Sequence, residues 1–130
     1  MILVDTHVVL WLALEPDKIS KKAATTIGDT RLSGEGLAIS DMTLLEIALA
    51  EGKRRIQLNA SLETFLTEVE SRFVVLPITA RVCVSAMALP SAYPKDPADR
   101  VIGATALVEG IPLITADNDI RKSKALRTIW

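Results

Sequence analysis

Short apolar runs alternate along this chain with segments of helical character, and this alternation restricts the fold more than any other feature. The runs are brief and rich in branched residues, as in strands buried on both faces of a parallel sheet. They occupy residues 1–4 (MILV), 36–40 (GLAIS), 72–78 (RFVVLPI), 112–115 (PLIT) and 126–130 (LRTIW). A repeated strand–helix–strand order builds a sheet covered by helices. The sequence therefore predicts one α/β domain over residues 1–130, with a mostly parallel central sheet flanked by helices.

The segments between the strands carry recognisable helix starts and stops. We expect helices at residues 6–14, 17–29 (closed by Gly28), 42–52 (capped by Ser40 or Asp41), from Ser61 onward, 80–89 (capped by Thr79), 96–110 and 119–125. The helix at 96–110 has Pro97 at its first position and Gly110 past its end, which is the usual asymmetry of helix termini. These signals fix the order of the elements along the chain.

Composition limits the kinds of protein that this chain can be. With 49% hydrophobic and 24% charged residues, it is not a disordered chain. Its net charge of −1 gives no general attraction to nucleic acid, so an anionic substrate needs a local basic patch or a metal ion. The single cysteine, Cys83, cannot form an internal disulfide, which is typical of a reducing compartment. Residues 1–14 are apolar but are interrupted by Asp5 and His7 and are too short to cross a bilayer. We therefore expect a cytoplasmic protein without membrane attachment.

Several acidic residues stand near the ends of the predicted strands. In an open parallel sheet, binding sites form beyond the carboxyl ends of the strands. Asp5 and Asp117 each come just after a strand, Ser40 marks the same edge, and Glu46 lies about two turns into the next helix. Asp99 opens a helix that leads back into a strand, so packing must place it. A carboxylate at the end of a buried strand is costly unless it is hydrogen-bonded, paired or bound to a cation.

Each acid also has an ordinary structural explanation. Asp96 begins the sequence Asp-Pro-Ala-Asp, which has the form of a helix cap, and Asp99 then favours the helix dipole. Glu46 shares one side of its helix with positions that do not require burial, so it could face solvent. Asp119 fits a turn that starts the short helix at 119–125. From the residues alone, caps and a shared site both stay open.

A shared site would need a cation, because converging carboxylates repel one another and raise their own pKa values. One histidine and one cysteine exclude a typical zinc centre. An all-oxygen set of ligands suits Mg²⁺ or Mn²⁺, which keep several waters and often bridge to a phosphate. Such an ion activates water and neutralises charge on a phosphodiester.

Four motifs, in their order along the chain, resemble those of the PIN-domain ribonucleases, and in particular the VapC-type toxins of bacterial toxin–antitoxin pairs. They are ILVDTHVVLWL, SDMTLLEIALAEGK, DPADRVIGATALVEG and IPLITAD, and the likeness runs from about residue 2 to about residue 121. By this resemblance Asp5, Glu46, Asp99 and Asp117 are the four catalytic acids. Asp5 and Asp99 are implied as the principal metal ligands, with Glu46 and Asp117 completing the pocket.

The resemblance also implies an activity and partners. It indicates an endoribonuclease dependent on Mg²⁺ or Mn²⁺, which hydrolyses RNA phosphodiester bonds with metal-activated water and acts as the toxin of a type II toxin–antitoxin pair. RNA, possibly transfer RNA, is the implied substrate, a cognate antitoxin the inhibitor, and a homodimer the usual assembly. Many relatives carry a histidine shortly before the third acid and an aromatic residue inside that motif. This chain has Tyr93, Lys95 and Ala98 there instead, which leaves the substrate preference open.

Further residues are expected to support the site. Thr6, Ser40 and Thr115 stand beside the matching acids and are expected to hydrogen-bond them or metal-bound water, and Asp96 is a cap or a neighbour of the third acid. Lys53, Arg54, Arg55 and Arg100 are candidates for contact with RNA or with the antitoxin. The ordinary alternative for the basic run at 53–55 is a solvated helix end. For His7 we expect a packing or loop role; the alternative, from its place two residues after Asp5, is an approach to the site.

Two other functions compete with the nuclease. One is a PIN-like module that binds RNA or protein without catalysis. The other is a phosphoryl-transfer domain, but a dehalogenase-type phosphatase needs a second aspartate where this chain has His7. A receiver domain needs a lysine after a late strand, where this chain has LITADND. Metal-dependent RNA cleavage separates these alternatives.

Overall fold

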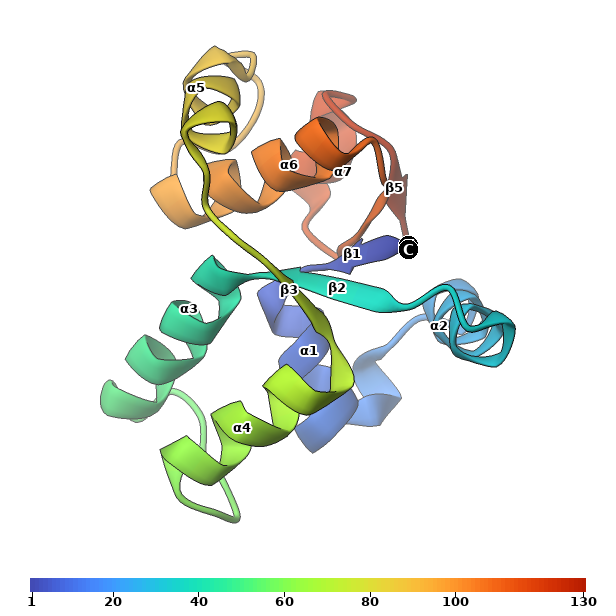
Figure 1. Ribbon diagram of the computed structural model, residues 1–130, viewed down its shortest axis with the longest axis vertical. Coiled ribbons are helices and arrows are strands. Elements are labelled where there is room, and N and C mark those ends of the chain that lie inside the picture. The colour runs from blue at the N-terminus through green and yellow to red at the C-terminus, as the bar shows by residue number, and fades with distance from the viewer.

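The computed structural model describes residues 1–130, and at its centre is a five-stranded sheet (Figure 1). Its strands are β1 (Ile2–Val4), β2 (Leu37–Ser40), β3 (Val74–Leu76), β4 (Leu113–Ile114) and β5 (Thr128–Ile129). They lie in the order β3-β2-β1-β4-β5, and every neighbouring pair is parallel. The predicted α/β class and parallel sheet are confirmed.

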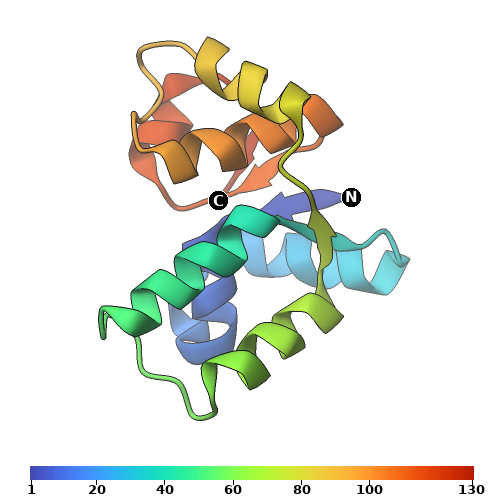
Figure 2. The same cartoon turned by 60° about the vertical axis from the view of Figure 1, so that its left-hand side comes forward.

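Helices cover both faces of this sheet. They are α1 (Thr6–Leu14), the short 3-10 helix η1 (Pro16–Lys18), α2 (Lys21–Ser33), α3 (Asp41–Gly52), α4 (Leu62–Arg72), α5 (Ala80–Ala88), α6 (Pro97–Glu109) and α7 (Asn118–Ser123). Figures 1 and 2 show α1 to α4 on one side of the sheet and α5, α6 and α7 on the other. None of these helices combines the length and the apolar character needed to span a membrane.

The strand order reverses at the centre of the sheet. From β1 the chain builds β2 and β3 on one side, and it then returns to place β4 and β5 on the other side. Between β1 and β4, Leu3 pairs with Leu113 and Val4 with Ile114, so the residues that follow these strands emerge side by side. A reversal of this kind leaves a crevice beyond the strand ends, where open α/β sheets bind ligands.

Alternating side chains of the strands supply a separate core on each face. In β1, Leu3 belongs to a cluster of eight buried residues with the inner side chains of α6 and α7, and Val4 to a cluster of eleven with those of α1 to α4. Ala38 and Ile39 of β2 divide in the same way. This division follows from the two-residue repeat of a strand. The strands are short; β2 and β4 are buried along their whole length, whereas the edge strands β3 and β5 are only partly covered.

The boundaries of one predicted helix were wrong. We expected a helix over residues 17–29 closed by Gly28, but a 3-10 turn comes first and α2 runs from Lys21 to Ser33. The Ser20 hydroxyl accepts a hydrogen bond from the Ala23 N–H and so sets the start. Gly34 ends the helix in a left-handed conformation, with φ of 76°. Gly28 is an interior helical residue, because glycine weakens a helix without stopping it.

Strand lengths and one cap also differ from the predictions. The runs at 72–78, 112–115 and 126–130 contribute only two or three paired residues each to β3, β4 and β5. The short helix begins at Asn118, and its cap is Asp117, whose side chain accepts the N–H groups of Asp119 and Ile120. An acid expected to complete the site therefore also caps a helix.

A close contact between Tyr93 and Gly103 packs the loop that follows α5 against α6. Tyr93 is only 1% exposed, and its hydroxyl donates a hydrogen bond to the carbonyl of Asp99 at 2.8 Å. A Cβ atom added at Gly103 would lie 2.3 Å from the Tyr93 hydroxyl oxygen and 3.2 Å from a methyl of Leu126. Only glycine leaves room for the ring at this point.

We predict that Gly103→Ala destabilises the protein by about 1–3 kcal/mol, since the added methyl overpacks the core. Gly28→Ala is the matched control, because no atom lies within 4 Å of its added Cβ. That control is expected to stabilise the fold by roughly 0.5–1 kcal/mol through helix propensity. Urea unfolding of both variants measures the two effects. Equal free energies of unfolding would contradict this description of the α6 contact.

Candidate active site

A hollow of about 390 Å³ opens where the strand order reverses, and we call it the acidic hollow. Its lining includes Asp5, Glu46, Asp96 and Asp99. These acids come from the end of β1, from α3 and from the start of α6. The structure therefore brings together side chains separated by more than ninety positions in the sequence.

Asp5 is the most deeply buried acid of the hollow, with 4% of its surface exposed. Its Oδ1 accepts the N–H of Thr6 at 2.8 Å, and its Oδ2 accepts the hydroxyl of Thr115 at 2.7 Å. The Nδ1 of His7 lies 3.5 Å from the same Oδ2. A carboxylate has about four lone-pair positions, so these neighbours leave room for roughly one further ligand.

Glu46 is half-buried and joins the site through Thr6. The Thr6 hydroxyl donates to Glu46 Oε1 at 2.5 Å and also lies 3.0 Å from the hydroxyl of Thr43. Burial raises the pKa of Glu46 above its usual value; the Thr6 hydrogen bond opposes this shift, and the charges of Asp5 and Asp96 add to it. The solvent-facing alternative for Glu46 is therefore wrong.

Asp99 lies in the first turn of α6 and faces the other acids. Asp96 caps this helix, its Oδ2 accepting the Asp99 N–H at 3.4 Å, and Tyr93 holds the Asp99 carbonyl. Burial raises the pKa of Asp99 to about 7, with further contributions from the charges of Asp5, Asp96, Glu46 and Asp117. An acid perturbed by burial and by several like charges in one hollow is a typical mark of a functional site.

Asp117 lies beside the hollow and is not part of its lining. Its carboxylate caps α7, while its backbone N–H donates to the Thr115 hydroxyl oxygen at 3.1 Å. Its charge nevertheless contributes to the raised pKa of Asp99. The structure therefore places three of the four predicted catalytic acids in the acidic hollow and the fourth at its border.

The three hydroxyl residues expected to support the acids have different roles. Thr6 donates to Glu46 and Thr115 donates to Asp5, so each one orients a carboxylate. Ser40 contacts no acid: it is fully buried, and its oxygen accepts the Met42 N–H as the cap of α3. The structure shows no hydrogen bond from Ser40 to an acid, and the expected contact with metal-bound water stays a prediction.

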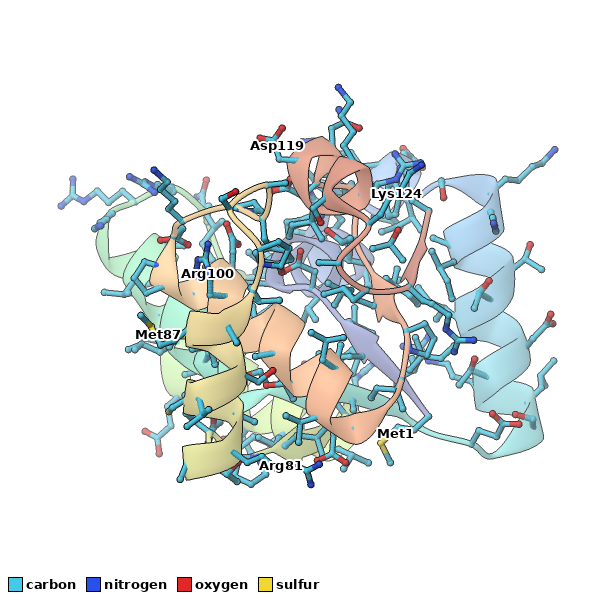
Figure 3. All side chains as sticks on the ribbon, turned by 90° about the horizontal axis from the view of Figure 1, so that it is seen from above. Met1, Arg81, Met87, Arg100, Asp119 and Lys124 are labelled. Carbon is cyan, nitrogen blue, oxygen red and sulfur yellow. The ribbon has the colours of Figure 1, made fainter.

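Arg100 has a structural position, and its candidate contact with RNA or the antitoxin stays a prediction. Its guanidinium donates to the carbonyls of Ala86, Leu89 and Tyr93, which lie at the end of α5 and in the loop after it. Figure 3 shows the residue between α6 and α5. Because its donors are used inside the fold, Arg100 braces the helix that carries Asp99.

Two of the three residues in the basic run belong to the hollow. Lys53 and Arg55 line it, whereas Arg54 does not. The end of α3 forms a Schellman turn, with the Arg55 N–H bonded to the Ala50 carbonyl and the Arg54 N–H bonded to the Glu51 carbonyl. Arg54 takes the left-handed position, with φ of 57°. This turn separates Arg54 from the two residues on either side of it.

His7 lies in the acidic hollow, which was the less favoured of the two positions expected for it. It lines the acidic hollow and contacts Asp5, and its Nε2 accepts the N–H of Ala116 at 3.0 Å. Its position two residues after an acid at a strand end was the available signal. The expected packing role is also present, since its ring meets Trp11 edge-on at 5.0 Å between centroids.

The donor set of the hollow fits a hard divalent cation. No three of the chain's His, Cys, Asp and Glu side chains converge closely enough to enclose an ion by themselves. Mg²⁺ does not need such a cage, because it is usually held by one or two carboxylates and keeps several waters. Asp5 and Asp99 offer carboxylate oxygens in one hollow, surrounded by like charges that a cation would neutralise.

Comparison with known proteins agrees with this description. Residues 2–126 match the PIN domain family, and the chain belongs to that family. It is 34% identical to Ribonuclease VapC22 of Mycobacterium tuberculosis over 131 residues, which cover 99% of this chain and 98% of that protein.

Solved structures share the fold at lower sequence identity. VapBC2 from Rickettsia felis, bound to a DNA fragment from its promoter, superposes with a TM-score of 0.71 at 17% identity, over 98% of this chain and 97% of that one. DNA-bound VapBC from Salmonella typhimurium gives 0.70 at 20% identity, over the same shares. These likenesses extend over nearly the whole chain and support the fold.

The raised pKa of Asp99 predicts how stability depends on pH in metal-free protein. Because the folded state raises this pKa from 3.8 to about 7, it binds the proton more tightly than the unfolded chain does. The free energy of unfolding should therefore fall as pH rises from about 4 to about 8. The pKa of Glu46 is also raised, so its ionisation lowers the free energy of unfolding in the same direction. Solvent screening limits the effect of Asp99 to about 1 kcal/mol.

Urea unfolding in EDTA at about pH 5 and about pH 8 measures this change. Asp99→Asn removes the ionisation and should flatten the dependence, making the variant more stable than wild type at the higher pH. If the variant and the wild type lost the same free energy between the two conditions, the assignment of this repulsion to Asp99 would be wrong.

Proposed function

We propose that this protein is a metal-dependent endoribonuclease that acts as the toxin of a type II toxin–antitoxin pair. The observation that carries the proposal is the acidic hollow, in which Asp5, Glu46 and Asp99 meet beside Lys53 and Arg55. The 34% identity to a ribonuclease over nearly the full length of both chains supports RNA as the substrate class.

In this proposal each side chain has a defined task. Asp5 and Asp99 hold Mg²⁺ or Mn²⁺, and the ion, when bound, supplies acidification of water and neutralisation of phosphodiester charge. Glu46, fixed by Thr6, orients the attacking water, while Asp117 adds negative charge at the border of the hollow. Lys53 and Arg55 bind the phosphates that flank the scissile bond.

Two observations weigh against the competing functions. The acids of the hollow are buried and mutually repulsive without a cation, which is costly to keep in a module that only binds. Phosphoryl transfer through an Asp5 phosphate is disfavoured because His7 stands two residues later, where a dehalogenase-type phosphatase needs a second aspartate.

We infer a cognate antitoxin as the protein partner, since VapBC pairs are among the structural neighbours. A groove of about 470 Å³ is lined by residues of α1, α2 and α4, and it shares no lining residue with the acidic hollow. Val9, Leu12, Phe65 and Val69 contribute apolar surface to it, and the two positive charges of Arg31 and Arg72 outnumber the one negative charge of Glu68. An antitoxin segment with apolar and acidic side chains would complement this groove.

The proposed protein is a homodimer and acts in the cytoplasm. The homodimer stays a prediction, and we assign it to the apolar side chains exposed on α5 and α6, namely Val84, Met87 and Leu107. Figure 3 shows Met87 at the outer side of α5. We place the protein in the cytoplasm, where RNA is available and where the unpaired Cys83 remains reduced.

We predict that Asp5→Asn and Asp99→Asn each lower the rate of Mn²⁺-dependent RNA cleavage by at least about 100-fold, because each removes a ligand charge. Purified protein and a pool of cellular RNA, with and without EDTA, provide the assay. Circular dichroism of each variant should match wild type, since removing one like charge relieves repulsion.

Asp119→Asn is the matched control, because Asp119 is exposed and its side chain points away from the molecule in Figure 3. It should cleave as wild type does. Expression of wild type without an antitoxin should also slow growth, and Asp99→Asn should not. Cleavage that persists in EDTA, or at full rate in Asp99→Asn, would overturn the metal-dependent nuclease.

The two sides of the Schellman turn allow a second comparison. Joint substitution of Lys53 and Arg55 by alanine should weaken RNA binding and reduce the slope of log affinity against log salt by about 0.7 for each lost phosphate contact. Arg54→Ala should leave both quantities near wild type, because Arg54 lies outside the hollow. Filter binding at several salt concentrations measures them. A larger loss of RNA affinity in Arg54→Ala than in the double variant would contradict the assignment of RNA contact to Lys53 and Arg55.

A further inference from the structure

His7 closes a ring of contacts around the carboxylate of Asp5. Thr115 donates its hydroxyl to Asp5 Oδ2 at 2.7 Å, and the next residue, Ala116, donates its N–H to His7 Nε2 at 3.0 Å. The other ring nitrogen of His7, Nδ1, returns to Asp5 Oδ2 at 3.5 Å. The ring thus joins the end of β1, the start of α1 and the loop that follows β4.

The chemistry of these atoms defines the form of the imidazole. A backbone N–H can only donate, so Nε2 must present its lone pair to Ala116. In the neutral ring the proton then resides on Nδ1, which is the nitrogen that faces Asp5. His7 therefore presents an acceptor to the loop and a donor to the carboxylate, which no apolar side chain can do.

The loop held by His7 also carries the other contacts of the site. Thr115 orients Asp5, and the N–H of Asp117 donates to the Thr115 hydroxyl oxygen at 3.1 Å. If Ala116 loses its acceptor, the loop keeps only the Thr115 hydroxyl as a side-chain hydrogen bond to the start of α1. The hydrogen bond between Ala116 and His7 is therefore the second attachment beside the hydroxyl that orients Asp5.

We propose that His7 is a positioning residue for Asp5: by holding the Ala116 N–H, it fixes the loop at residues 115–117 and aims the Asp5 carboxylate into the acidic hollow. This inference rests on the proposed function, since Asp5 is there a metal ligand. It assigns to His7 a task that its contact with Trp11 does not require, because an edge-on ring contact needs no nitrogen.

Three substitutions separate the two tasks of the ring. His7→Phe keeps an aromatic ring against Trp11 and removes both nitrogens. His7→Gln places an amide oxygen near the position of Nε2 and can accept the Ala116 N–H. His7→Asn keeps a polar group near Asp5 but is too short to reach Ala116. The order of the variants therefore reports whether the contact with Ala116 matters.

The first measurement is the dissociation constant for Mn²⁺ alone, by calorimetry on the full chain without RNA. We expect His7→Phe and His7→Asn to bind Mn²⁺ about 10–100-fold more weakly, the range found when a partner of a metal ligand is lost. His7→Gln should recover most of the affinity. In RNA cleavage the loss should appear in kcat more than in KM, since His7 holds no RNA in this assignment.

The second measurement is hydrogen exchange at the Ala116 amide, which does not depend on metal or RNA. Exchange should accelerate in His7→Phe and His7→Asn and remain slow in His7→Gln. Trp11→Phe is the control for packing and should leave this amide protected.

The two proposals fail in different ways. A wild-type protein that neither binds Mn²⁺ nor cleaves RNA would overturn the proposed nuclease function. Hydrogen exchange at the Ala116 amide would then show by itself whether His7 holds the loop. If wild type binds Mn²⁺ and cleaves RNA, and His7→Phe does both equally well, the positioning role of His7 is wrong. The proposed nuclease function is then unaffected. Rescue by asparagine but not by glutamine would also overturn it.

Discussion

The buried carboxylate of Asp5 is the constraint on which the rest of this structure depends. It ends the central strand of a parallel sheet, where a charge without partners would oppose folding. Backbone and hydroxyl donors from Thr6 and Thr115 compensate part of this cost, and they come from the segments that follow β1 and β4, the two strands between which the order reverses. The same arrangement that makes the charge tolerable leaves one side of the carboxylate open to a cation.

The other acids are brought to Asp5 by packing that is itself specific. Tyr93 fits against Gly103 and holds the Asp99 carbonyl, and Arg100 ties the same helix to α5. On the opposite side Thr6 connects Glu46 to the start of α1. Rigid elements therefore hold like charges near one another in a half-buried hollow, and in the proposed function a cation relieves their repulsion. This separation of scaffold and site explains why removing one acid should spare the fold.

The sequence predicted the fold class and the order of the elements because both follow from periodicity and from caps such as Ser61 and Gly110. It also indicated Asp5, Glu46 and Asp99, through their places relative to strand ends and through resemblance. It could not show that Ser40 and Arg100 are used inside the fold, because a cap and a carbonyl contact depend on three-dimensional neighbours. The role of His7 was hidden for the same reason, since Ala116 is distant in sequence. Gly28 misled the prediction because glycine is tolerated within a helix.

The central claim is that one divalent cation relieves the repulsion between Asp5 and Asp99 in the acidic hollow. Anomalous diffraction from crystals grown with Mn²⁺ tests this claim most directly. We expect an anomalous peak within ligand distance, about 2.2 Å, of oxygens from both carboxylates, with waters in the remaining positions. A fully loaded crystal with Mn²⁺ bound elsewhere, and with both carboxylates free of it, would contradict the account.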